Sequence, residues 1–247
     1  MLILGTILNV AAIVMGGLAG LCLKGTPSQQ TQATLRTVLG MVTVLAGLHF
    51  CWTHLHGGWR GGIKQGFVAC LALVVGNVIG KALGLQNGSN RLGHFAGKVV
   101  EQAAANQQFR AGDGFLACTV LFCIAPLTFL GCVQEGLSGD WRSFAIKSVV
   151  DAMAAMSFVG LFGWATLWVA IPVLAWQGSL TLLVALAAPW LQSHLLVDSI
   201  LVTSGLLLCC VSVLILQTRK VRIADYLPSL MVAPLITKLV GLVADSK

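Results

Sequence analysis

The sequence contains few charged residues. Asp, Glu, Lys and Arg make up 9% of the 247 residues and hydrophobic residues 57%, whereas soluble domains carry about 25% charged residues. The mean hydropathy of +0.90 excludes a soluble domain and predicts an all-α integral membrane protein, since helices satisfy their own backbone in lipid. The net charge of +7 is therefore assigned to loops facing the cytoplasm, and no nucleic acid is expected as a partner.

Catalytic and metal-binding patterns are missing as well. We find no HExxH, no phosphate-binding loop and no nucleophile–base–acid set, so neither an enzyme nor a cofactor is predicted. The eight cysteines form no CxxC pair and are expected to pack as small apolar side chains. His54 and His56 form an HxH without a third ligand, so no metal site is predicted.

Long apolar runs are what the sequence has in abundance. A membrane span needs about 20 apolar residues, and the runs predict a polytopic helix bundle with about eight spans. The N-terminal run has no basic residue before it, so we expect it to be retained as the first span. The spans cover residues 2–23, 35–55, 65–85, 114–133, 196–217 and 225–244, and two more share 144–191.

The longest uncharged run, 152–197, contains no Asp, Glu, Lys or Arg. As one helix it would far exceed the hydrocarbon thickness of about 30 Å, so the chain must turn back within it. Two full spans fit, and so does a span followed by a discontinuous helix near 166–190, which the fold prediction includes. The candidate break points are Gly160, Gly163, Pro172 and Gly178.

Basic residues divide unevenly between the predicted loops, and the richer set should be cytoplasmic. With eight spans this puts both termini in the periplasm. The only long connector, 86–113, alternates apolar and polar residues at helical spacing, which predicts a cytoplasmic amphipathic helix, with a solvated connector as the alternative. The richer set comprises Lys24, Arg36, Arg91, Lys98, Arg110, Arg219, Lys220 and Arg222.

Weak internal similarity predicts an inverted repeat. VIGKALGL at 78–85 matches LITKLVGL at 235–242, TVLGMV at 37–42 matches VTSGLL at 202–207, and GTILN at 5–9 matches GSLTL at 178–182. Spans one to three would thus correspond to spans six to eight with opposite topology, as in many secondary transporters. The resulting division of a single membrane domain, 1–247, is repeat one at 1–85, connector at 86–113, central spans at 114–165 and repeat two at 166–247.

Glycines recur at four-residue spacing in two spans. Gly76, Gly80 and Gly84 lie in the third span, and Gly16 and Gly20 lie in the first. Small residues let helix backbones approach closely in a bilayer. Packing within the chain and an interface in a homodimer or higher homo-oligomer both fit this pattern.

Polar residues at membrane depth form the candidate substrate or ion site. Lys147 and Asp151 lie one helical turn apart at the head of the longest uncharged run. Ionisable groups there cost at least about 2.5–3.5 kcal/mol, so the pair either neutralises itself or faces a polar cavity. The candidate site comprises Thr6, Asn9, Lys147, Asp151, Gln177 and Thr181.

Seven stretches occur in a distinctive order: GTILN (5–9), GGLAG (16–20), FLACTVLFC (115–123), GCVQEGLSGD (131–140), KSVVDAMAAMSF (147–158), IPVLAWQGSLTLL (171–183) and VRIADYLPSLMVAPL (221–235). In these stretches the sequence resembles the bacterial inner-membrane family called domain of unknown function 554, the YqgA-like membrane proteins. At CIAP, residues 123–126, the sequence departs from the glycine-rich turn expected there, so Pro126 should kink the fourth span differently. The resemblance implies a polytopic protein of the bacterial inner membrane and favours a transporter.

Three functions fit these observations. The first is a secondary transporter that carries a small solute or ion through a polar site between inverted repeats. The second is an ion channel, which glycine-rich spans also suit. The third is a membrane scaffold or regulatory protein without transport, in which Lys147 and Asp151 only pair during folding.

Overall fold

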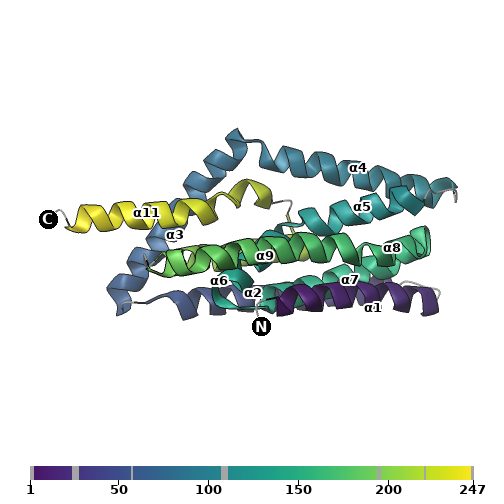
Figure 1. The fold of residues 1–247 in the computed structure, drawn as a ribbon, viewed down its shortest axis with the longest axis horizontal. Helices are drawn as coiled ribbons and strands as arrows, with labels where there is room; N and C mark the ends of the chain where they lie inside the picture. Colours follow the sequence, from purple (N-terminus) through teal and green to yellow (C-terminus); the bar gives the residue numbers. More distant parts are fainter. Residues whose placement is uncertain are drawn as a thin grey trace. The chain divides into compact units, whose positions relative to one another are not determined.

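The computed structural model describes residues 3–23, 28–56, 58–106, 111–193, 196–219 and 221–245, and these form helices and no strand (Figure 1). The all-helical prediction is confirmed. The elements are α1 (Leu4–Leu23), α2 (Gln29–His54), α3 (Gly58–Ala82), α4 (Leu85–Asn106), α5 (Ala111–Ile124), α6 (Pro126–Ser138), α7 (Arg142–Phe162), α8 (Ala165–Trp168), α9 (Ala170–Ser193), α10 (Val197–Ile215), the 3₁₀ helix η1 (Ile223–Tyr226) and α11 (Ser229–Asp245).

Seven described helical segments are long and apolar enough to cross a membrane, and the bent pair α5–α6 is an eighth candidate. The expected number of spans is thus confirmed by length and composition. The termini, 1–2 and 246–247, lie outside the described residues, so their sidedness stays a prediction. The seven segments are Leu4–Leu23, Gln29–His54, Gly61–Ala82, Arg142–Phe162, Ala165–Gln192, Val197–Ile215 and Ile223–Gly241.

The long uncharged run turns back at one of its predicted break points. Gly163 has φ 58° and ends α7, a conformation that glycine adopts without steric cost. The break expected beside Gly178 is wrong, because Gln177 and Gly178 lie inside α9; between 166 and 190 only Val169 interrupts the helices. Pro172 lies in the first turn of α9, where proline is tolerated.

The sharp break lies instead between α5 and α6, which meet at 54°. Proline disfavours helical geometry at the residue before it, and Ala125 is extended, with φ −55° and ψ 133°. Pro126 then begins α6, where its missing N–H leaves no helical bond unmade. The kink predicted at Pro126 is confirmed.

The described helices form two compact units. Unit 1 comprises 1–35 and 87–183, and unit 2 comprises 36–86 and 184–247. The predicted division into repeats, connector and central spans is not tested by this grouping and stays a prediction. The amphipathic helix expected in the connector is present as α4.

Glycines set the closest helix contacts within unit 1. A Cβ at Gly16 would lie 2.7 Å from Ala152 Cα, and one at Gly20 would lie 3.0 Å from Met156 Cα. Both neighbours belong to α7, which runs alongside α1 (Figure 1). The stripe in the first span therefore packs within the chain and holds α1 against α7.

The same device operates within unit 2. A Cβ at Gly76 would lie 2.6 Å from Ser229 Cα, and one at Gly80 would lie 2.7 Å from Asp225 Cα, so these glycines pack α3 against η1 and α11. Gly84 does not belong to the stripe: it has φ 65° and makes the turn into α4, with nothing near its Cβ position. The predicted homo-oligomer stays a prediction.

Candidate functional site

The six polar residues predicted as a site all lie in unit 1, each at most 5% exposed. Thr6 and Asn9 belong to α1, Lys147 and Asp151 to α7, and Gln177 and Thr181 to α9. Asn9, Lys147, Asp151 and Gln177 are joined by hydrogen bonds and an ion pair. We call these four residues the polar centre.

The ion pair of the polar centre lies on one face of α7. Lys147 Nζ pairs with Asp151 Oδ2 and also donates a hydrogen bond of 3.1 Å to the carbonyl oxygen of Phe122. That carbonyl belongs to the last turn of α5, where helix carbonyls lack partners and the helix dipole favours a cation. The positive charge of Lys147 is therefore stabilised both by the carboxylate of Asp151 and by the C-terminal end of α5.

Asn9 connects three helices through its amide nitrogen. Its Nδ2 donates to Asp151 Oδ2 at 3.1 Å and to Gln177 Oε1 at 3.2 Å. The other amide atoms of these two residues, Asn9 Oδ1 and Gln177 Nε2, are buried without a hydrogen-bond partner. The polar centre thus contains one hydrogen-bond acceptor, Asn9 Oδ1, and one donor, Gln177 Nε2, without a partner.

Two predicted site residues lie apart from the polar centre. Thr6 donates from its hydroxyl to Glu135 Oε2 at 3.1 Å. Thr181 follows Gln177 by one turn of α9, and its hydroxyl is buried without a hydrogen-bond partner. Neither makes a described bond to Asn9, Lys147, Asp151 or Gln177.

Sequence reasoning missed Glu135, a buried acid in α6 that is 1% exposed. Its carboxylate accepts the backbone N–H groups of Gly5 and Thr6, in the first turn of α1. Those N–H groups have no partner inside the helix, and a carboxylate there is stabilised by the helix dipole. The sequence assigned Glu135 to a loop after residue 133, and only the break at Pro126 turns it inward.

Asp225, in unit 2, is a further buried acid that was not predicted. It pairs with Arg222 Nε at 2.9 Å and accepts the backbone N–H of Gln86 at 2.9 Å, while Gln86 Oε1 accepts from Ala224 N. These bonds connect η1 to the start of α4. Asp151 is therefore one of three acids buried in the described part of the chain.

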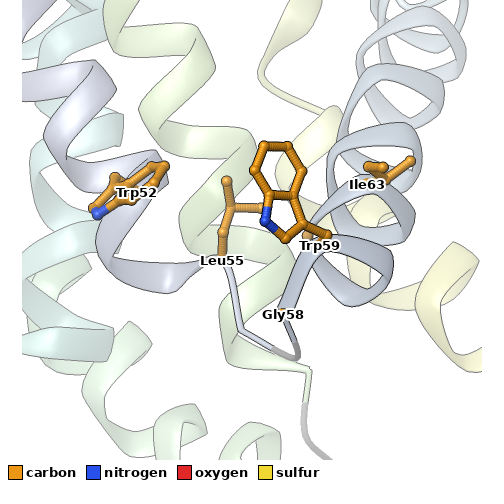
Figure 2. Close-up of a pocket in the computed structure, with 6 residues that line it drawn as sticks. Trp52, Leu55, Gly58, Trp59 and Ile63 are labelled. Carbon is orange, nitrogen blue, oxygen red and sulfur yellow. The ribbon is translucent and has the colours of Figure 1, made fainter.

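The surface hollows of unit 2 are of two kinds. One, of about 500 Å³, lies at the turn from α2 to α3 and is lined by Trp52, Leu55, Trp59 and neighbouring apolar residues (Figure 2). Its tryptophans are strongly exposed, as in the aromatic belts of membrane proteins. The other, of about 270 Å³, has charged and polar side chains in its lining, among them His56 with Nδ1 3.5 Å from Asp198 Oδ2.

The two histidines of the HxH motif do not converge on a metal position. His54 Nδ1 lies 2.9 Å from the carbonyl oxygen of Phe50, whereas His56 faces Asp198. Among the described residues, no three His, Cys, Asp or Glu side chains are grouped closely enough to hold a metal ion.

Comparison with known proteins decides the family. The sequence profile described as "Protein of unknown function (DUF554)" matches residues 4–238. The chain belongs to the DUF554 family. Together with the apolar helices, this makes it a polytopic membrane protein and confirms the resemblance drawn from the sequence.

Two relatives match almost the full chain. The "Uncharacterized membrane protein YdfK" of Bacillus subtilis (strain 168) is 25% identical over 232 residues, which cover 94% of each chain. The "Uncharacterized protein YqgA" of Escherichia coli (strain K12) is 24% identical over 237 residues, 94% of this chain and 95% of that one. No solved structure matches this DUF554 chain.

Proposed function

We propose that this DUF554 protein is a secondary transporter that carries a small solute or ion across the bacterial inner membrane. The observation that carries the proposal is the polar centre: side chains from α1, α7 and α9 meet the end of α5 at one buried ion pair. Solute sites of transporters are built in this way from discontinuous helices and a few polar side chains.

The free-energy cost of burying two charges supports a functional role for Lys147 and Asp151 over a role in packing alone. Removing two charges from water costs several kcal/mol per ion, and well-packed apolar residues of similar volume often stabilise a fold as well or better. A protein that needed only to fold would gain little from Lys147 and Asp151 at this depth. Ionisable residues inside membrane helices commonly mark solute or proton pathways.

The contacts between matched helices support an inverted repeat, on which the proposed transport cycle depends. Asn9 of α1 bonds Gln177 of α9, a Cβ at Gly47 of α2 would lie 2.8 Å from Gly205 O of α10, and α3 packs on α11. These are the three helix pairs that the repeat matches. A pseudo-two-fold axis pairs each element with its counterpart in this way.

The experiment is a flux screen with purified protein in proteoliposomes. Ions, amino acids, organic acids and uncharged solutes are offered, and both electrical current on a solid-supported membrane and radiolabelled uptake are measured. We expect a flux with the wild-type protein that falls to the level of protein-free vesicles with Asn9→Leu. A flux that Asn9→Leu leaves unchanged would remove the polar centre from the pathway, and resolved single-channel steps would favour a channel.

A further inference from the structure

The orientation of both amides in the polar centre follows from the ion pair. Lys147 fixes Asp151 as a carboxylate acceptor, so Asn9 must present its NH₂ group to Asp151. The same NH₂ group faces Gln177, which must then present its carbonyl oxygen. Turning either amide over would place oxygen against oxygen or NH₂ against NH₂.

This ordering leaves two particular atoms without partners. Asn9 Oδ1 is an acceptor and Gln177 Nε2 a donor, and both side chains are 0% exposed. Buried polar groups are nearly always hydrogen-bonded, because an unpaired one costs about 1–3 kcal/mol. A ligand that donates to Asn9 and accepts from Gln177 would complete both groups.

The neutral charge balance of the polar centre also limits the charge that a ligand can carry. Lys147 and Asp151 neutralise each other, and Glu135 is matched by the first turn of α1. A monovalent ion bound at the two amides would therefore add an uncompensated charge in a buried site, at a large desolvation cost. An uncharged molecule adds none.

We infer that Asn9 Oδ1 and Gln177 Nε2 form the recognition site for a small uncharged solute that carries both a hydrogen-bond donor and an acceptor. This inference rests on the proposed function. Amides, ureas and small polyols have this chemistry. Each group offers at least one hydrogen bond to the solute. Removal of either group reduces flux by roughly tenfold, which corresponds to the loss of one hydrogen bond in the transport pathway.

The test measures uptake of radiolabelled urea, acetamide and glycerol into proteoliposomes, with sodium, rubidium and chloride uptake measured in parallel. The wild-type protein should admit at least one of the three uncharged probes faster than protein-free vesicles. Gln177→Met, which keeps the side-chain volume but lacks both the free donor and the acceptor that Asn9 uses, should lower that rate roughly tenfold. Ser179→Ala, an exposed position on the same helix, should leave it unchanged.

The outcomes separate this inference from the function on which it rests. Uptake of an inorganic ion without uptake of the uncharged probes would overturn the inference and leave the transporter proposal standing. Uncharged uptake that Gln177→Met does not reduce would overturn the recognition role of the amides alone. Absence of uptake of all six probes by folded protein would overturn this inference, and the transporter proposal would then be decided by the amino acids and organic acids of the flux screen.

Discussion

Two buried acids, Asp225 in unit 2 and Asp151 in unit 1, are held in contrasting ways. In unit 2, Asp225 is held by backbone N–H of Gln86 and by Arg222, whose side chain is 51% exposed. In unit 1, Asp151 is held by side chains alone, Lys147 and Asn9, and the network continues to two amide atoms without partners. The bonds of Asp225 connect two backbone segments. The network around Asp151 leaves one acceptor and one donor unused, and a binding site requires such groups.

The largest expected effect comes from opening the ion pair of unit 1. Asp151→Leu would leave the Lys147 ammonium buried without its anion, which typically costs about 3–5 kcal/mol. We expect a large fall in thermal stability, measured in detergent by fluorescence-detected size exclusion. The matched change Lys147→Met with Asp151→Asn removes both charges and keeps an acceptor for Asn9, so most of the stability should return. A double variant as unstable as the single one would mean that the pair is needed for folding.

The next largest loss of stability is expected in unit 2, where α3 lies closest to η1. Gly80→Ala would place a Cβ against the backbone of Asp225, and overpacking of this kind costs about 1–3 kcal/mol. The resulting shift of η1 should appear as a lower melting temperature. Gly88→Ala in α4 is the control, because nothing lies within 4 Å of its Cβ position. Equal melting temperatures for the two variants would contradict the packing assigned to Gly80.

A smaller loss of stability is expected from a change at Glu135, the buried acid of unit 1 that was not predicted from the sequence. Glu135→Gln keeps one oxygen acceptor at the start of α1, replaces the other carboxylate oxygen with an NH₂ group that cannot accept, and removes the negative charge. Charges at helix ends contribute typically 0.3–1 kcal/mol, and up to about 2 kcal/mol when partly buried. Thermal unfolding should show a loss in this range, and Glu101→Gln, at an exposed position of α4, should show none.

The sequence predicted much of this fold because membrane spans depend on composition. Runs of apolar residues located the spans, and the kink at Pro126 followed from the backbone restrictions of proline. Gly178 was expected to break α9 but does not, since helices in lipid tolerate glycine when the backbone bonds can form. A residue type marks where a helix can break, and tertiary packing decides where it does.

The polar centre was predicted in part for a related reason. Lys147, Asp151, Asn9 and Gln177 stand out because polar side chains are rare in apolar runs, and all four do meet. Glu135 could not be found in this way. Its burial depends on where α6 begins and on the position of the first turn of α1 more than a hundred residues away in the chain.

The most direct test of the central claim is solute flux through the double variant Lys147→Met with Asp151→Asn. We expect a folded protein whose uptake, across the panel that the wild-type protein transports, equals that of protein-free vesicles. Wild-type flux through the folded double variant would contradict the claim, because the ion pair would then serve only to hold the helices together.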